Sequence, residues 1–246
     1  MKITYVEHSS FIVSLNDCNL LFDYYKGDLF TLENNKPLYV FSSHAHWDHF
    51  NIDILKQIKN INNITFILSK DIKNLVVEGE PIQSYIEKEG FQNIYWLGEN
   101  ESLQLNNQGK QLVINTLKST DEGVAFLINY DGKNIFHSGD LHWWSWIGES
   151  EEYNNKMEED FKSEINKLIG KHIDVAFLVL DPRLEIRYDW GMNYCINHLD
   201  IDYVIPMHCQ GNYTIFDTYR NENKDCCKKV TMLDFKEAGS FVNLEK

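Results

Sequence analysis

The sequence predicts an α/β (α+β) chain in which two β-sheets carry helices on their outer faces. Short apolar strand patterns recur along the whole chain, and stretches with helical spacing of apolar residues separate them. Hydrophobic residues make up 43% of the 246 residues, which is enough for a core and too much for a disordered chain. No internal repeat, low-complexity tract or linker rich in Pro, Gly or Ser is visible, so we expect one domain over residues 1–246.

The first half of the chain begins with strands that alternate apolar and polar residues and continues with short, fully apolar strand patterns. Strands are predicted at residues 3–6, 10–14, 19–23, 38–42 and 64–68. Helical spacing of apolar residues predicts helices at residues 51–59 and 81–89, the first with Asn51 as its N-cap.

The second half returns to strands and ends in an alternation of helices and buried strands. Strands are predicted at residues 112–115, 124–128, 134–137, 175–180 and 202–207. An apolar stripe over residues 157–169 predicts a helix with Gly170 as its C-cap, and residues 190–199 predict a second helix.

The chain is strongly acidic. Lys and Arg total 23 against 37 Asp and Glu, which gives a formal charge of −14 at pH 7. An acidic surface repels phosphate backbones, so we expect no nucleic-acid partner. The N-terminus lacks the features of a signal peptide, and the longest apolar runs fall far short of the roughly 20 residues of a membrane helix. We therefore expect a cytoplasmic protein with no membrane partner, and its oligomeric state stays open.

The five cysteines are an odd number and include no C-x-x-C pair. This argues against a disulfide scaffold and against a structural zinc knuckle.

The most informative stretch follows the predicted strand at residues 38–42. His44, His46, Asp48 and His49 place three imidazoles and a carboxylate within six residues. Residues two apart on an extended segment point the same way, so His44 and His46 are able to bind one ion together, while Asp48 and His49 face a second ion. This density is typical of metal ligation, and a loop of solvated histidines is the disfavoured alternative.

This H-x-H-x-D-H pattern resembles the metallo-β-lactamase superfamily. The resemblance implies a four-layer αββα sandwich of the metallo-β-lactamase type with its ligands at one edge of the two sheets. It also implies that Asp140, in the later Gly-Asp motif, bridges two metals, and that His208 after a late strand completes the ligands. Residues 5–11 and the Pro-Met-His ending at His208 look like the branch of L-ascorbate-6-phosphate lactonase and related small hydrolases.

One histidine that the superfamily normally supplies is absent from the stretch at residues 116–123. Asp121 would replace it with an oxygen ligand, which suits manganese or iron as well as zinc, or it caps a turn. Lys118 would alternatively put a positive charge in the place of an ion. We therefore expect zinc, as one or two ions, with manganese or iron as alternatives.

The ligands imply a metal-dependent hydrolase that acts through a metal-bound hydroxide on a small ester, lactone or phosphoester, including anionic ones. Asp48 and Asp140 are its predicted catalytic residues, and the expected partner is a small-molecule substrate. Two alternatives are a metal-binding or sensory protein with weakened catalysis and, less favoured by the charge, a nuclease of the same fold.

Four residues near the predicted ligands are candidates for substrate contacts: Arg183, Trp47, His142 and Trp143. Arg183 suits a phosphate or carboxylate, with an ion pair to Asp181 as the equally weighted alternative. The aromatic residues either line the pocket or pack beneath the helix that follows residue 150. Outside this group, His8 is interpreted as a core histidine of a strand.

Overall fold

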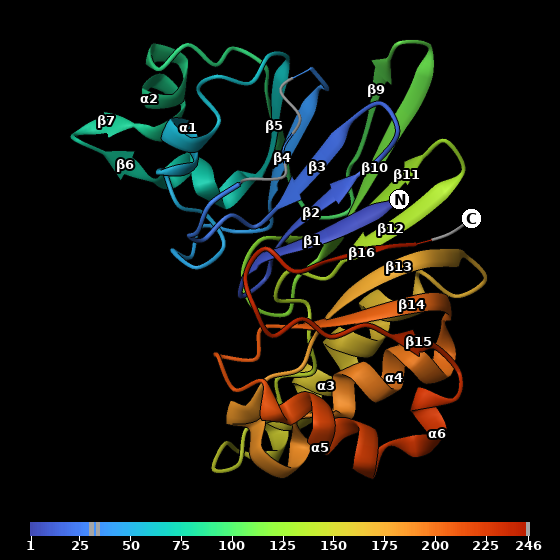
Figure 1. Cartoon of the computed structure of the whole chain (residues 1–246). Helices are drawn as coiled ribbons and strands as arrows, with labels where there is room; N and C mark the ends of the chain where they lie inside the picture. Colours follow the sequence, from blue (N-terminus) through green and yellow to red (C-terminus); the bar gives the residue numbers. More distant parts are fainter. Residues whose placement is uncertain (30–31, 33–34, 245–246) are drawn as a thin grey trace. The chain divides into compact units, whose positions relative to one another are not determined.

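The computed structural model describes residues 1–29, 32 and 35–244, and the chain divides into two compact units. Unit 1 comprises Met1–Gly98 and Phe235–Lys246, and unit 2 comprises Glu99–Asp234. Each unit contains one seven-stranded mixed sheet with helices (Figure 1). The single domain over residues 1–246 stays a prediction, and each unit is described by itself.

The sheet of unit 1 has the strand order β16-β1-β2-β3-β4-β5-β8, with antiparallel pairs up to β3 and parallel pairs from β3 onwards. Its strands are β1 (Lys2–Glu7), β2 (Ser10–Ser14), β3 (Asn19–Phe22), β4 (Leu38–Ser42), β5 (Ile64–Ser69), β8 (Ile94–Leu97) and β16 (Phe241–Asn243). The remaining elements are α1 (Ile54–Gln57), the 3-10 helix η1 (Lys70–Asn74), the hairpin strands β6 (Val76–Val77) and β7 (Glu80–Pro81), and α2 (Ile82–Lys88).

The helices of unit 1 bury their apolar sides in the same core as the central strands. Ile54 and Ile58 from the α1 region and Ile82 from α2 join Val40 and Phe66 of the sheet in one cluster. Burial of such side chains stabilises the unit by about 1.5–3 kcal/mol each.

The predicted helix at residues 51–59 is shorter in the structure, and its predicted N-cap is wrong. Asp53 occupies the N-cap position, and the Asn51 side chain accepts a hydrogen bond from the Asp53 N–H (2.9 Å) in the turn before α1. Asn51 therefore stabilises a local turn, which competes with helix at this kind of residue.

The sheet of unit 2 has the order β15-β14-β13-β12-β11-β10-β9. The pairs from β9 to β12 are antiparallel, and those from β12 to β15 are parallel. Its strands are β9 (Ser102–Asn107), β10 (Lys110–Lys118), β11 (Val124–Tyr130), β12 (Lys133–His137), β13 (His172–Val179), β14 (Asp200–Met207) and β15 (Thr231–Met232). Its helices are α3 (Glu151–Asn166), the 3-10 helix η2 (Pro182–Arg187), α4 (Trp190–His198), α5 (Thr214–Glu222) and α6 (Lys224–Cys227).

The predicted helix over residues 157–169 is α3, which begins earlier and ends earlier than expected. Ser150 starts it, with its side chain accepting a hydrogen bond from the Tyr153 N–H. Lys167 is the C-cap, so the prediction of Gly170 for that position is wrong. Gly170 instead adopts a left-handed φ of 83° in the turn that follows, a conformation that suits glycine.

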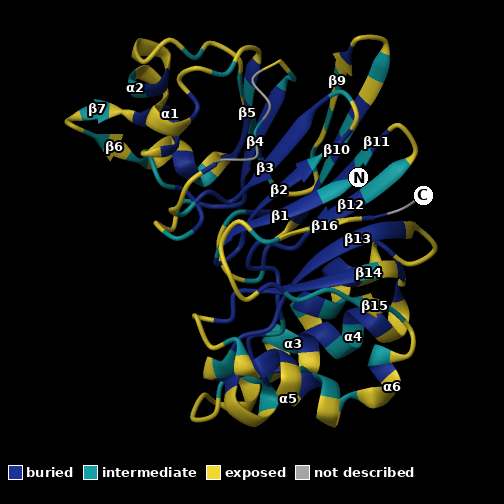
Figure 2. Ribbon diagram, viewed as in Figure 1, coloured by how far each residue is buried: buried dark blue, intermediate teal, exposed yellow. Residues whose placement is uncertain are grey.

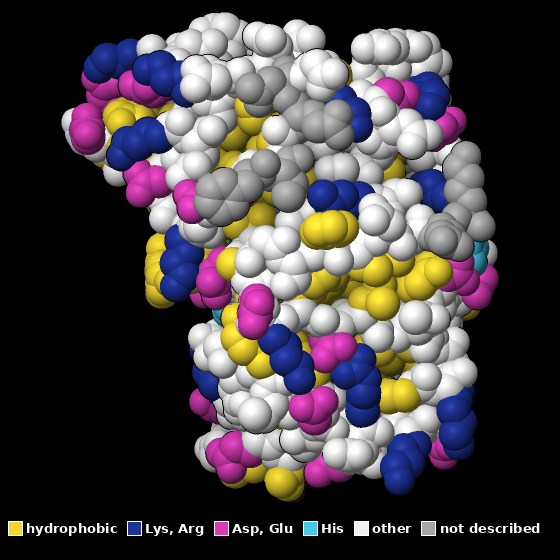
Figure 3. Space-filling view, in the orientation of Figure 1, with side chains coloured by type: hydrophobic (Ala, Val, Ile, Leu, Met, Phe, Trp, Pro, Cys, Tyr) yellow, Lys and Arg dark blue, Asp and Glu magenta, His cyan; other side chains and the backbone are white. Residues whose placement is uncertain are grey.

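The burial pattern agrees with a core made by the sheets. The strands are largely buried, whereas the helices of unit 2 keep exposed outer sides (Figure 2). Lys and Arg side chains are interspersed with Asp and Glu on the face drawn in Figure 3.

None of the helices in the described part of the chain combines the length and the apolar character that a membrane span requires. All five cysteines are free thiols in the structure.

Candidate metal centre

The donor residues of unit 1 lie at the carboxyl ends of three neighbouring parallel strands. Asp23 follows β3, residues 43–49 follow β4, and Asp71 lies just beyond β5. Because parallel strands end at the same edge of a sheet, side chains far apart in the sequence meet there. Asp71 Oδ2 accepts a hydrogen bond of 2.7 Å from the Ala45 N–H, which fixes the histidine-bearing loop to the end of β5.

Asp23 orients two of the predicted histidine ligands. It is fully buried and accepts hydrogen bonds of 2.7 Å from the Ser43 N–H, the Ser43 hydroxyl and Nδ1 of His49. The Ser43 Oγ also lies 2.9 Å from Nδ1 of His44. Because the hydroxyl donates its proton to Asp23, it accepts the proton of His44 Nδ1. Both rings therefore carry their proton on Nδ1 and a lone pair on Nε2, the arrangement of histidines that bind metals.

His44 and His46 converge, as the sequence predicts for residues two apart. Nε2 of His44 lies 2.9 Å from Nδ1 of His46. The His44 ring is completely buried, while His46 is exposed. The two rings therefore meet beside each other at the end of β4.

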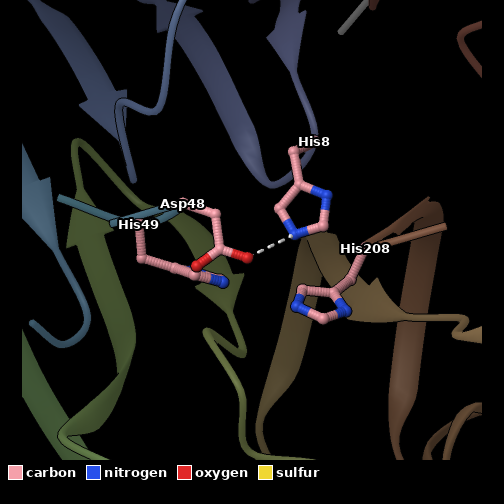
Figure 4. A group of neighbouring side chains, drawn as sticks. All are labelled: His8, Asp48, His49 and His208. Atoms are coloured by element: carbon pink, nitrogen blue, oxygen red, sulfur yellow. Dashed lines mark ion pairs between the residues drawn. The ribbon is translucent and has the colours of Figure 1, made fainter. Parts of the chain in front are cut away.

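Asp48 is paired with a histidine that sequence reasoning did not connect with the site. Nε2 of His8 lies 3.4 Å from Asp48 Oδ2 (Figure 4). Burial raises the pKa of Asp48, but the hydrogen bond from His8 and the neighbouring His49 lower it by more, so the net pKa is well below the ordinary value. Asp48 is therefore a carboxylate at neutral pH, able to ligate a cation or to accept a hydrogen bond from water.

His8 occupies the turn between β1 and β2 rather than a strand. Its φ is 57°, and its backbone N–H donates to the Tyr5 hydroxyl at 2.9 Å. The interpretation as a strand histidine is wrong because β1 ends at Glu7, although the ring is buried. A left-handed non-glycine residue is uncommon, but only the structure reveals it.

Unit 2 repeats this arrangement at the carboxyl ends of β12, β13 and β14. Asp140, Asp181 and His208 follow these three parallel strands. The Nδ1–H of His208 donates to Asp181 Oδ2 at 2.9 Å, and Nε2 of His208 lies 3.5 Å from Asp140 Oδ1. His208 is drawn at the end of its strand in Figure 4. The buried Asp181 thus fixes the proton of His208 on Nδ1, as Asp23 does in unit 1.

Arg183 makes the ion pair with Asp181 that the sequence allows. Its Nε donates to both carboxylate oxygens of Asp181 at 2.9 and 3.0 Å, and its Nη2 donates to Oδ2 at 2.5 Å. Burial raises the pKa of Asp181, but hydrogen bonds from His208 and Arg183 bring it down to about 2. Arg183 also lines a cavity of about 170 Å³ together with Asp121 and Asp140, so its contact with a substrate anion stays a prediction.

The segment without the expected histidine connects β10 to β11. The Thr120 hydroxyl donates to the carbonyl of His142 (2.6 Å) and accepts from its N–H (2.9 Å), which ties this segment to the loop after β12. Asp121 lines the same cavity as Asp140. Lys118 is more than half exposed, with Nζ 3.8 Å from Glu99, which does not favour its ammonium as a substitute for an ion.

The aromatic candidates separate into buried and exposed residues. His142 is 2% exposed, and burial lowers its pKa to about 3, so the ring is neutral. The ring centroids of His142 and Trp143 lie 6.1 and 6.3 Å from that of Phe161 in α3, and the role of these residues in substrate binding stays a prediction. Trp47 in unit 1 is 68% exposed, with its ring 4.9 Å from that of Tyr25.

The chain is similar to solved structures over its whole length. A metallo hydrolase from the archaeon Ignicoccus hospitalis has 19% identity and a TM-score of 0.67, with 100% of this chain and 98% of that one covered. A possible metal-dependent hydrolase from Veillonella parvula has 12% identity, a TM-score of 0.60 and 99% coverage of both chains. The metallo-β-lactamase fold protein YhfI from Bacillus subtilis has 12% identity and a TM-score of 0.60, with 98% and 99% covered. These similarities confirm the predicted fold class.

No curated protein matches the chain. The model of a family described as Beta-lactamase superfamily domain matches residues 2–145, which is more than half of the sequence. The branch of L-ascorbate-6-phosphate lactonase stays a prediction. The chain belongs to the metallo-β-lactamase superfamily through this domain.

Proposed function

We propose that the protein is a metal-dependent hydrolase of a small ester, lactone or phosphoester. Its ligands would be His44, His46, Asp48 and His49 from unit 1 and Asp140 and His208 from unit 2. The observation that carries this proposal is the common arrangement of three imidazoles. His44, His49 and His208 are each held at Nδ1 by a hydroxyl or a carboxylate, which leaves the lone pair of Nε2 for a cation.

The donor set fits a divalent transition metal. Imidazole nitrogens with carboxylate oxygens suit zinc, and they suit manganese and iron when oxygen ligands increase. We propose Asp121 as an additional oxygen ligand, because Asp121 and Asp140 line one cavity of unit 2. Zinc, as one or two ions, is therefore the proposed cofactor, and manganese or iron is the alternative.

Different residues of the chain would have different roles in hydrolysis. A bound cation would polarise the scissile bond and lower the pKa of water. Asp48, kept as a carboxylate by His8, would orient the attacking water by accepting its hydrogen bond. Arg183 would bind an anionic group of the substrate, since its side chain is half exposed and lines the cavity beside Asp140.

The proposal is tested with the full-length protein, prepared with zinc or manganese, on panels of esters, lactones and phosphodiesters. We expect hydrolysis of at least one class, lost on chelation with EDTA and restored by the metal. Asp140→Asn should lower the rate at least about 100-fold. Asp174→Asn is the matched control, because Asp174 is also buried in unit 2 but pairs with Lys133 at 2.6 Å. A protein that binds metal yet hydrolyses no class would contradict the proposal.

That contrary result would favour the second candidate, a metal-binding or sensory protein. The absence of the expected histidine at residues 116–123 supports this candidate, because an incomplete ligand set would weaken catalysis. A nuclease is less favoured, because the charge of −14 opposes binding of a phosphate backbone.

A further inference from the structure

The cavity of unit 2 that Asp121 and Asp140 line also has a wall of aromatic side chains and a methionine. Trp144 and Trp146 come from the loop after β12, and Tyr153 and Met157 come from the first half of α3. Asp140 lies in the same lining. None of these four side chains is proposed to hold a cation, so the wall is available to contact another part of a ligand.

The wall at Trp146 is held in place through its backbone. The side chain of Asn154 in α3 accepts from the Trp146 N–H at 2.9 Å and donates to the Trp146 carbonyl at 3.1 Å. Arg187 donates to the same carbonyl at 3.1 Å. The Trp146 ring stacks on Trp144 with 5.9 Å between centroids and an interplanar angle of 7°. A wall fixed in this way would lose little conformational entropy when a ligand binds.

The size of the cavity limits the group that fits. Its volume is about 170 Å³. A cavity of about 150 Å³ accommodates benzene, so this volume is that of a single six-membered ring with a small substituent, although the lining also includes Thr120, Asp121 and Arg183. Tryptophan and tyrosine favour flat partners because their rings stack, and methionine adapts its shape to the ligand edge.

We propose that this cavity binds a flat hydrocarbon group of the substrate, about the size of one benzene ring, beside Asp140. The assignment of that group to a substrate rests on the proposed function. The substrate class is thereby narrowed to aryl or arylmethyl esters and to lactones that carry one such ring. Two fused rings exceed the space unless Trp146 is removed.

The test measures binding without turnover. Fluorine NMR titrations follow 4-fluorobenzyl alcohol and a fluorinated naphthylmethanol with the full-length protein. Neither probe has a bond to hydrolyse, so the outcome is independent of the activity panels. We expect the benzyl probe to bind with a Kd of about 1 mM and more tightly than the naphthyl probe.

Two variants change the cavity in opposite directions. Trp146→Ala enlarges it, so binding of the benzyl probe should weaken about fivefold and the naphthyl probe should become the tighter ligand. Met157→Trp fills it, so the benzyl probe should lose measurable binding. Trp190→Ala is the matched control, because Trp190 is a partly exposed tryptophan outside the cavity lining. Arg187 lies over its ring at 5.3 Å, as Arg183 lies over the Trp146 ring at 5.8 Å.

The reversal of probe preference in Trp146→Ala, with Trp190→Ala unchanged within about twofold, supports the proposal. Equal affinities of Trp146→Ala and the wild type for both probes would overturn it. Absence of benzyl binding in the wild type, or the same loss in Trp190→Ala, would overturn it as well. Hydrolysis without ring binding would leave the proposed function standing and refute only this inference.

Discussion

The buried carboxylate of Asp23 accepts three hydrogen bonds, so Asp23→Asn should lower both the stability of the fold and the affinity for metal. Asparagine tolerates the left-handed φ of 43° at this position, so the backbone is not the cause of any loss. The carboxylate accepts from the Ser43 N–H at one oxygen and from the Ser43 hydroxyl and His49 at the other. An amide has one oxygen, so it serves only one of these two sides.

Either orientation of the amide has a cost. With its oxygen toward the Ser43 N–H, the amide N–H₂ faces His49 and forces the ring proton from Nδ1 to Nε2, where it blocks the ligating lone pair. With the opposite orientation, two donors face each other in a fully buried site. The loss of one charge-assisted bond and the burial of an unsatisfied donor amount to about 2–3 kcal/mol. In a chain of this length that lowers the Tm by about 5–10 °C.

The assay is a thermal melt with and without metal, combined with a metal titration. Metal affinity should fall about 10- to 100-fold. Asp71→Asn is the control, because Asp71 also bonds the ligand loop, but it does so by accepting from the Ala45 N–H, which an amide oxygen still accepts. Wild-type Tm and metal affinity in Asp23→Asn, or equal losses in Asp71→Asn, would refute the reasoning.

Three further predictions concern steric fit, charge and thiol reactivity. Gly191→Ala should destabilise the protein by about 1–3 kcal/mol in urea unfolding, although Ala normally favours a helix, because the new Cβ would lie 2.5 Å from the His142 ring; equal or higher stability would contradict this. The hydrogen bond to Asp200 raises the pKa of His172, so this pair stabilises the fold below the unfolded pKa and loses its effect as pH rises through the folded pKa. Asp200→Asn should therefore lower the Tm slightly at pH 5.5 and not at pH 8.5, and an equal change at both pH values would disprove the assignment. Burial raises the pKa of the Cys195 thiol to about 12, so iodoacetamide at pH 8 should modify it only after unfolding; rapid modification of the folded protein, read by peptide mass spectrometry, would be inconsistent.

The sequence was sufficient for features that depend on local patterns. Buried parallel strands such as β4 and β13 are continuous apolar runs, so their positions were predictable. The ligand candidates after β4 were visible because their density has no ordinary packing explanation. The short edge strands β15 and β16 were missed, since strands of two and three residues with partial exposure carry little pattern.

The hydrogen bonds by which Asp23 and Asp181 orient the histidines are not predictable from the sequence, for a different reason. Asp23 and His49 are 26 positions apart, and Asp181 and His208 are 27 apart. Only the parallel pairing of neighbouring strands brings these residues together, and spacing in the sequence does not encode that pairing. The sequence indicates Asp181 only as a partner of Arg183, whereas in the structure it bonds both Arg183 and His208.

The central claim is that histidines of both units bind metal, and metal content tests it most directly. Inductively coupled plasma mass spectrometry of the protein prepared with zinc or manganese should give at least about one ion per chain. His44→Ala in unit 1 and His208→Ala in unit 2 should each lower that content. Negligible metal in the wild type, or undiminished metal in both variants, would contradict the claim.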